Sequence, residues 1–332
     1  MSRSGEVLVL TAKDVRRLLS IDDCIEAVEL AFLAYGEQRV GPPAVLSVHT
    51  SRGGFHIKAG SLELTKPYFV AKVNANFPDN RTQFDLPTIQ GVIVLCDAER
   101  GTPLALMDSG DITSLRTAAA TAVAARHLAR RNSTVATICG CWDQGRIQLK
   151  ALSRVCNLQG AFAFDKSTER ASEFATELSE HLVIPVTVAS DLSLAVRESD
   201  VCVTCTTSQQ PLLSSEDVLP GTFIAAVGAD NPQKQELHPT LLAKSKVIVD
   251  VLEQCAVMGD LHHALQAGAM TLGDVHADLG EVVAGTKAGR ESDQEIIVFD
   301  STGMALQDVA VAGVVYEKAV RSGTGIRLGL AA

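Results

Sequence analysis

The second half of the chain alternates short apolar runs with helical segments, and this alternation constrains the fold more than any other feature. Strands are predicted at residues 135–139, 160–164, 184–188, 200–204, 222–227, 246–250 and 295–299. Strands that alternate with helices form βαβ units, and such units build a mainly parallel sheet. The sequence therefore predicts an α/β fold with one parallel-sheet domain in this half.

The first half has a different period. Its short β-branched or alternating runs are separated by Gly, Pro and Asn, which is typical of a mostly antiparallel or mixed sheet. The predicted strands are 7–10, 44–50, 54–60, 68–76 and 89–96. Thr11 is expected to cap a helix through about residue 19, and Ser20 or Asp22 a second helix through about residue 37. This half is therefore expected to be a separate α+β domain.

Two long helices are expected, one before the alternating strands and helices of the second half and one after them. An Ala-rich helix follows Asp111 and ends near residue 131, and a last helix covers about 303–321 with no strand after it. The last helix can pack back on the first domain. The expected domains are therefore 1–118 together with 304–332, and 119–303.

Charge and hydropathy exclude two classes of partner. The formal net charge is −10, so non-specific binding to nucleic acid is not expected. The sequence has no run of about 18 apolar residues, so no membrane span is predicted, and the first residues do not resemble a signal peptide. A cytoplasmic protein is therefore expected. Most of the eight Cys lie in apolar runs and are read as reduced, and no second pair accompanies the CxxC at Cys202–Cys205, so no metal site is predicted.

The strand at 135–139 runs directly into a glycine turn. In the pattern G-x-G-x-x-G, which binds a pyrophosphate at a helix N-terminus, the glycines would stand at 140, 142 and 145. Gly140 and Gly145 match, whereas Trp142 replaces the glycine that allows close backbone approach, and Gln144 lies in the same turn. The turn predicts a dinucleotide-binding Rossmann domain over 119–303, with cofactor affinity that depends on how the Trp142 indole is placed.

The second strand of this domain ends in an acid. Asp165 lies 25 residues after Gly140, where a carboxylate accepts hydrogen bonds from ribose hydroxyls and favours NAD. The alternative is that Asp165 only caps the next helix. Lys166, Ser167 and Arg170 follow closely, so NADP is not excluded.

Two lysines stand out in the apolar strands of the first domain. Lys58 and Lys72 each interrupt a hydrophobic run, which is costly unless the ammonium group meets a partner or a ligand anion. An edge position or a side chain that reaches solvent would also explain each one. His56 shares a strand face with Lys58, so it is a further candidate for a site there.

Several motifs, in order and spacing, resemble the ornithine cyclodeaminase/mu-crystallin family over nearly the whole chain. They are Lys72–Pro78, Leu86–Gly91, Gly101–Asp108, Ile112–Ala119, Val227–Leu237 and Phe299–Gly303. The resemblance implies a mixed-sheet dimerisation and substrate domain joined to a Rossmann domain, with the active site in the cleft between them. It also implies a homodimer.

The resemblance also implies roles for individual residues. Lys72 is expected to hold the substrate carboxylate, and Asp230 is expected to lie beside the substrate amine as an acid. Thr88 is expected near the substrate, while Arg116, Thr117 and Ser301 match positions near the cofactor. For Asp230, a turn-forming role before Asn231-Pro232 is the alternative.

The chain departs from the family's pattern at one further place. Family members usually carry an Arg that grips the substrate carboxylate just after a Pro-rich entry to the first sheet, whereas this chain has Ala44. Lys58 stands where many members have an apolar residue. Lys58 is therefore predicted to replace the missing cation, without the bidentate grip of Arg.

These residues predict an NAD(H)-dependent amino-acid dehydrogenase or imine (ketimine) reductase that acts on a small 2-imino or 2-keto acid. The nicotinamide would carry the hydride, and the protein would supply orientation and charge. Three alternatives remain open: a cyclodeaminase that releases ammonia from a diamino acid such as ornithine, a non-catalytic ligand-binding protein like mu-crystallin, and a structural oligomer with a vestigial site.

Overall fold

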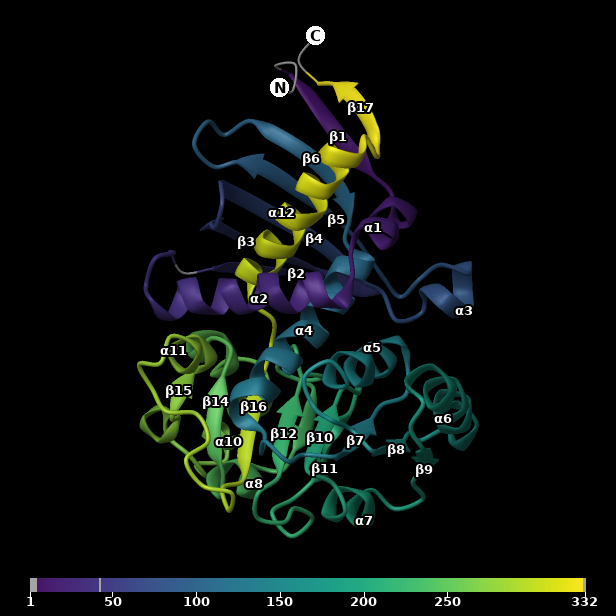
Figure 1. Cartoon of the computed structure of the whole chain (residues 1–332), viewed down its shortest axis with the longest axis vertical. Helices are drawn as coiled ribbons and strands as arrows, with labels where there is room; N and C mark the ends of the chain where they lie inside the picture. The colour runs from purple at the N-terminus through teal and green to yellow at the C-terminus, as the bar shows by residue number, and fades with distance from the viewer. Residues whose placement is uncertain (1–4, 42, 331–332) are drawn as a thin grey trace. The chain divides into compact units, whose positions relative to one another are not determined.

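The computed structural model describes residues 5–41 and 43–330, and the chain divides into two compact units. The first unit comprises Met1–Arg116 and Met304–Ala332, and the second comprises Thr117–Gly303. Among the described residues, no helix combines the length and apolar character needed to cross a membrane. Each unit has its own sheet, shown in Figure 1.

A seven-stranded mixed sheet forms the first unit. Its order is β17-β1-β6-β5-β4-β3-β2. β1 pairs in parallel with β6 and every other pairing is antiparallel. The strands are β1 (Glu6–Leu10), β2 (Ala44–Thr50), β3 (Gly53–Glu63), β4 (Pro67–Asn76), β5 (Ile89–Asp97), β6 (Pro103–Asp108) and β17 (Ile326–Gly329).

Two helices of the first unit, α1 and α2, begin at side-chain caps that the sequence predicts. Thr11 and Ser20 each form a capping box, at the start of α1 (Ala12–Leu18) and of α2 (Ile21–Gly36). α12 (Ala305–Ser322) crosses one face of the sheet and contacts α2, β3 and β4 (Figure 1). Gly60 and Gly313 allow this close packing, because a Cβ there would lie 3.2 Å from Leu306 and 3.1 Å from Tyr68. A short helix, α3 (Asn80–Phe84), precedes β5.

The expected absence of a strand after the last helix is wrong. β17 follows α12 and pairs with β1, from Glu6 opposite Gly329 to Val9 opposite Ile326. Its four residues are all exposed, so no buried face produces an alternating apolar pattern there. The sheet also gains β6, which was not predicted as a strand.

An eight-stranded sheet forms the second unit, and every pairing in it is parallel. Its order is β15-β14-β16-β12-β10-β7-β8-β9. The strands are β7 (Val135–Cys139), β8 (Gly160–Phe164), β9 (Val186–Val188), β10 (Val201–Thr204), β12 (Phe223–Ala226), β14 (Lys246–Val249), β15 (Ala277–Asp278) and β16 (Ile297–Asp300). The predicted parallel Rossmann-type sheet is therefore confirmed.

Helices and a small second sheet surround these strands. They are α4 (Gly110–Leu128, which spans the unit boundary), α5 (Asp143–Leu152), α6 (Thr168–Leu182), α7 (Leu192–Arg197), α8 (Pro239–Ala243), α9 (Leu252–Cys255), α10 (Asp260–Gln266), η1 (Leu272–Asp274) and α11 (Leu279–Val283), with β11 (Gln209–Leu213) and β13 (Gln235–Leu237). The order of the strands reverses between β7 and β10, which lie side by side. β8 and β9 lie on one side of β7, and β10 and β12 lie on the other. In open parallel sheets, ligands bind outside the carboxyl ends of the strands at such a switch point.

Candidate active site

A buried cluster of two cations and one carboxylate lies inside the first unit. The Lys72 Nζ of β4 is 2.8 Å from both carboxylate oxygens of Asp308 on α12. The Arg116 Nε of α4 is 3.3 Å from Asp308 Oδ1, and Arg116 also donates to Gln307 Oε1 at 3.1 Å. Lys72, Arg116 and Asp308 are 2%, 6% and 0% exposed, so these charges interact with little screening by water.

Burial sets the protonation of this cluster. It lowers the pKa of Lys72 to about 7, against the opposing effect of Asp308, and the charges of Arg116 and Lys58 lower it further. Burial alone would raise the pKa of Asp308, but the charges of Lys72 and Arg116 hold that pKa below its usual value. Asp308 is therefore ionised, and one carboxylate serves two cations.

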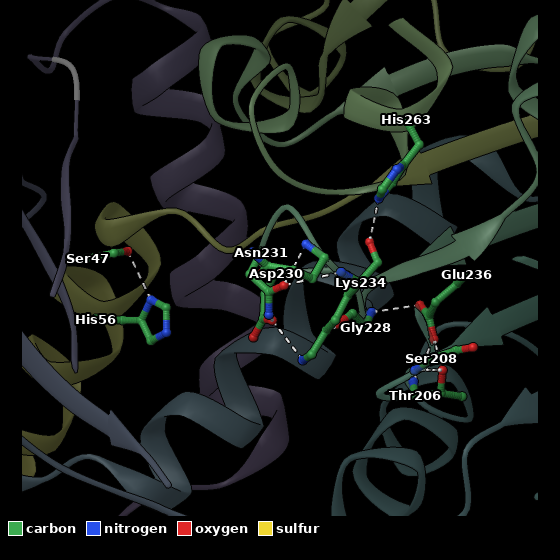
Figure 2. A network of polar contacts seen from close by, with 11 residues as sticks. Ser47, His56, Thr206, Ser208, Gly228, Asp230, Asn231, Lys234, Glu236 and His263 are labelled. Atoms are coloured by element: carbon green, nitrogen blue, oxygen red, sulfur yellow. Dashed lines mark hydrogen bonds and ion pairs between the residues drawn. The ribbon is translucent and has the colours of Figure 1, made fainter. Parts of the chain in front are cut away.

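Lys58 faces the same side of the sheet as Lys72. The two lysines are direct cross-strand partners in the β3–β4 ladder. Like charges at directly opposed positions destabilise a sheet. His56, two residues before Lys58, bonds through Nδ1 to Ser47 Oγ at 3.1 Å (Figure 2). The structure therefore brings Lys58, Lys72 and His56 to one sheet face.

Asn74 extends this polar face along β4. Its Oδ1 accepts from Ser109 Oγ at 2.7 Å, and its Nδ2 donates to Thr113 Oγ1 at 3.4 Å. Thr88 lies before β5, where its carbonyl accepts from the Phe77 N–H at 2.9 Å. This bond fixes the backbone on either side of the segment that carries α3.

Gly140 and Gly145 form a tight turn between β7 and α5. Gly140 has φ +105°, and a Cβ there would lie 2.9 Å from the Cys205 carbonyl oxygen. A Cβ on Gly145 would lie 2.0 Å from the Gly140 oxygen. Only glycine fits either position without a shift of backbone, and the turn presents the N-terminus of α5 at the switch point. This cradle fits the pyrophosphate of a dinucleotide.

The Trp142 side chain lies against Arg170. The indole is 48% exposed, and the Arg170 Cζ lies 3.8 Å from its ring centroid. Arg170 Nη1 in turn donates to Asp165 Oδ1 at 2.9 Å. The ring therefore extends towards the end of β8, and it is not buried in the core beneath the turn.

Asp165 ties three segments together. Besides Arg170, it accepts from the Cys141 N–H through Oδ2 and from the Ser167 N–H through Oδ1, both at 2.9 Å. Ser167, rather than Asp165, is the N-cap of α6. Burial, with Asp165 as a second cause, raises the pKa of the Cys141 thiol to about 12, so this sulfur stays protonated.

Asp230 lies in the loop that follows β12. Its Oδ1 accepts from Lys234 Nζ at 2.7 Å, and the same Nζ donates to the Gly228 carbonyl at 3.2 Å. His263 Nε2 lies 2.8 Å from the Lys234 carbonyl oxygen (Figure 2). The Asp230 side chain is 51% exposed.

A buried carboxylate anchors this loop. Glu236 accepts from Thr206 N at 2.6 Å and Thr206 Oγ1 at 2.7 Å through one oxygen. Its other oxygen accepts from Thr204 Oγ1 at 2.8 Å and Gly228 N at 2.9 Å. Figure 2 shows the donors of Thr206 and Gly228 converging on Glu236, which thereby connects the end of β10 to the start of the Asp230 loop.

Ser301 lies at the carboxyl end of β16. Its hydroxyl donates to Asp250 Oδ2 at 2.9 Å, and the residue is 5% exposed. Thr117, by contrast, lies half-buried in α4, directly after Arg116.

Three residues of these networks have no role predicted from the sequence: Asp308, and Lys234 and Glu236 within the Val227–Leu237 motif. Asp308 contacts Lys72 across 236 positions of sequence, so no local pattern predicts the pair. A signal for it does exist, because Asp308 is an acid that, with Gln307, interrupts the apolar start of α12. Such an acid is rarely buried unless it is paired.

Comparison with known proteins adds a family and several relatives. The model of the ornithine cyclodeaminase/mu-crystallin family matches residues 6–323. An alanine dehydrogenase from Archaeoglobus fulgidus is 40% identical over 97% of this chain and 98% of its own.

Solved structures agree in fold. An archaeal alanine dehydrogenase dimer with bound NAD has a TM-score of 0.93 at 41% identity, covering 98% of this chain and 99% of that one. The Δ1-pyrroline-2-carboxylate reductase of Thermococcus litoralis, in complex with NADH and L-proline, has a TM-score of 0.91 at 34% identity, covering 96% and 99%.

Proposed function

Because the chain belongs to the ornithine cyclodeaminase/mu-crystallin family, we propose that it is an NAD(H)-dependent oxidoreductase acting on CH–NH2 or C=N groups. It interconverts a small 2-amino acid and the matching 2-imino or 2-keto acid. The first unit binds the substrate, and the second binds the dinucleotide. The relatives described above support this proposal, since they include an alanine dehydrogenase and an imine reductase with bound NAD or NADH.

The observation that carries the proposal is the cluster of Lys72, Arg116 and Asp308. One carboxylate faces both Arg116 and Lys72, so when Lys72 is protonated the cluster has an excess of positive charge that a substrate carboxylate would complement. A bound carboxylate would also favour the protonated form of Lys72, whose pKa burial lowers to about 7. Arg116, predicted near the cofactor, is accordingly proposed to act on the substrate anion.

The remaining residues have proposed roles in the same reaction. Lys58 adds a further cation for the carboxylate, and Asp230 holds or supplies the proton on the substrate nitrogen, since a protonated imine is the better electrophile. Lys234 orients Asp230 through its 2.7 Å contact. The Gly140–Gly145 turn and Asp165 hold the dinucleotide, whose nicotinamide supplies the hydride chemistry when bound. The remaining predicted residues have supporting roles in this proposal. The substrate side includes His56 and Thr88, and the cofactor side includes Thr117, Gln144 and Ser301.

A spectrophotometric assay tests the proposal. NADH consumption is expected with pyruvate plus ammonia or with Δ1-pyrroline-2-carboxylate, and NAD reduction with the matching amino acid. A cyclodeaminase would instead release ammonia from L-ornithine without net change in NADH. A protein that binds NADH and turns over none of these compounds would be a ligand-binding relative, and the proposal would be wrong.

Two variants test the assigned groups. Asp230→Asn is expected to lower kcat/KM by about 10²–10⁴-fold, the range for loss of a general acid–base group. Lys72→Met is expected to raise KM for the keto or imino acid, and the exposed Lys66→Met is its matched control. Lys58→Ala with unchanged substrate affinity would contradict the role of Lys58.

A further inference from the structure

Lys58 and Lys72 are opposed across the β3–β4 ladder, and this pair is here called the lysine rung. The rung lies on the sheet face that α12 covers. Gly60, two positions after Lys58 on β3, shares that face, because a Cβ there would lie 3.2 Å from Leu306 of α12. Like charges at opposed positions destabilise a sheet, so an anion held between the two ammonium groups would be stabilising.

Asp308 supplies negative charge to this rung from α12. It lies 2.8 Å from Lys72 Nζ and 3.3 Å from Arg116 Nε. Burial acts to raise the pKa of Asp308, but the charges of Lys72, Arg116 and Lys58 together hold that pKa below its usual value. Three cations of the first unit therefore act on one carboxylate. With all three protonated, a single substrate carboxylate would leave this set of groups with an excess of positive charge.

The next rung of the same face adds a donor and no acid. It pairs His56 with Asn74, about 7 Å along the strands from the lysine rung. Ser109 and Thr113 hold the Asn74 amide, and His56 Nδ1 lies 3.1 Å from Ser47 Oγ (Figure 2). In the tautomer in which Nδ1 accepts from that hydroxyl, Nε2 of His56 carries the proton and is a donor.

This pattern of charge discriminates among the side chains of possible substrates. The ammonium group of a diamino acid would bring a further positive charge towards Lys58 and Lys72, and juxtaposed like charges oppose binding. A side-chain carboxylate would instead form a charge-assisted bond. Lys58 is half-buried, so water screens such a bond less than it would at the surface. A negatively charged side chain is therefore favoured over a positive one.

We infer that the substrate is a short dicarboxylic acid, a 2-imino or 2-keto acid whose side chain ends in a second carboxylate. Lys72 and Arg116 hold the carboxylate next to the reacting carbon. Lys58 holds the carboxylate of the side chain, with His56 as a further donor. This inference rests on the proposed function and deepens it, because it names the class of substrate and makes Lys58 a residue that determines specificity.

Steady-state kinetics with NADH and ammonia test the preference. They compare oxaloacetate and 2-oxoglutarate with pyruvate and 2-oxobutyrate. For at least one dicarboxylate, kcat/KM is expected to exceed that of both monocarboxylates by about 10-fold or more, the effect of one hydrogen bond to a charged group. Lys58→Met is expected to lower this ratio by about 10-fold, mainly through KM.

Two further variants control for the loss of Lys58. Lys58→Arg keeps the positive charge and is expected to retain the preference for a dicarboxylate. Lys66→Met removes an exposed lysine of the same unit and is expected to behave as the wild type.

Calorimetric titration with succinate and butyrate measures the second carboxylate without turnover. Butyrate has a methyl group where succinate has its second carboxylate, and NADH is present throughout. Succinate is expected to bind the wild type about 10-fold more tightly than butyrate or better, and Lys58→Met less than about 3-fold more tightly. The wild-type comparison decides the question even if Lys58→Met does not fold.

The outcomes separate this inference from the proposed function. If the protein turns over pyruvate or 2-oxobutyrate at least as efficiently as both dicarboxylates, the inference alone is wrong. A preference for dicarboxylates that Lys58→Met leaves unchanged has the same meaning. Tighter succinate binding that depends on Lys58, with no turnover of any imino or keto acid, supports the inference on the bound acid and overturns the proposed function. Succinate binding no tighter than that of butyrate, again without turnover, overturns both.

Discussion

Asp308 is the residue on which the charge balance of the first unit depends. It is 0% exposed and forms ion pairs with both Lys72 and Arg116. Removing one partner of a buried ion pair leaves an uncompensated charge in a medium that solvates it poorly, which costs more than the pair itself contributes. Asp308 is therefore expected to matter for stability as well as for activity.

Asp308→Asn is expected to lower the free energy of unfolding by about 3–5 kcal/mol, because two buried cations lose their counter-charge. Urea denaturation followed by circular dichroism measures the change. Asp111→Asn is the control, since Asp111 pairs with Arg16, which is 73% exposed, and such pairs contribute about 0–1 kcal/mol. Equal stability of Asp308→Asn and wild type would contradict the pairing.

Lys72 makes stability depend on pH. Its pKa is lowered from 10.5 to about 7, so between these values the folded chain binds fewer protons than the unfolded chain. Stability should therefore rise with pH across this window, by up to about 1.4 kcal/mol per pH unit, and the gain is lost as pH falls towards 7.

Lys72→Met should lack this rise, so the difference in free energy of unfolding between wild type and variant should change from pH 7 to pH 9. Lys66→Met, an exposed lysine, should follow the wild type at every pH. Parallel pH profiles of wild type and Lys72→Met would refute a lowered Lys72 pKa.

At this scale, sequence reasoning identifies residues better than it identifies their contacts. Lys58 and Lys72 are visible as charges in apolar strands, and their shared face follows from the two-residue period of a strand. The contact of Arg116 with Asp308 is not visible, because it depends on how α4 and α12 pack in three dimensions. The stacking of Arg170 on Trp142 likewise depends on rotamers that no sequence period encodes.

The loop between β12 and β13 depends on one buried side chain. Glu236 receives four hydrogen bonds from Thr204, Thr206 and Gly228, and it follows the loop that carries Asp230. Burial raises the pKa of Glu236, although each of these donors favours the ionised form. Glu236 therefore ties the loop to β10, in addition to the contacts of Lys234 with Asp230 and Gly228 within the loop.

Glu236→Gln is expected to destabilise the second unit by about 1–3 kcal/mol, because the amide NH2 group is placed against N–H and O–H donors. Amide hydrogen exchange of residues 227–235 should accelerate, and kcat should fall together with the order of the loop. Glu216→Gln, on an exposed side chain of the same unit, should change neither quantity. Unchanged exchange in Glu236→Gln would show that the loop is held by other contacts.

The elements with buried faces follow well from the sequence. β7, β10, β12 and β16 have every residue buried or nearly so, and each has an apolar run within two or three residues of its ends. β17 could not be predicted in this way, because its residues are exposed and its partner strand lies more than 300 positions away in the sequence. Pairing between the chain ends leaves no local trace.

The uncovered face of the seven-stranded sheet is apolar. Leu46, Val48, Phe55, Phe69 and Val92 alternate with the residues that face α12, and they are 57%, 46%, 37%, 37% and 39% exposed. A contiguous apolar sheet face of this kind usually marks an interface. We propose a second copy of the chain as its occupant.

Wild-type protein is therefore expected to be a homodimer by light scattering after size exclusion, and Val48→Glu combined with Val92→Glu is expected to be monomeric. Buried carboxylates at these positions would face each other or apolar side chains across the interface. Leu194→Glu, at a 61% exposed position in the second unit, should remain dimeric. A monomeric wild type, or a dimeric double variant, would contradict this interface.

The first unit is assembled from two stretches that the whole second unit separates in the chain. β17 and α12 complete its sheet and its core, yet they come after Gly303. During synthesis by a ribosome, the continuous segment 117–303 can therefore fold as it emerges, whereas the edge of β1 that pairs with β17 and the sheet face beneath α12 are covered only after residues 305–329 have been made. A nascent chain stalled before residue 304 would expose that face to solvent, and transiently exposed apolar surface of this kind makes folding intermediates prone to aggregate.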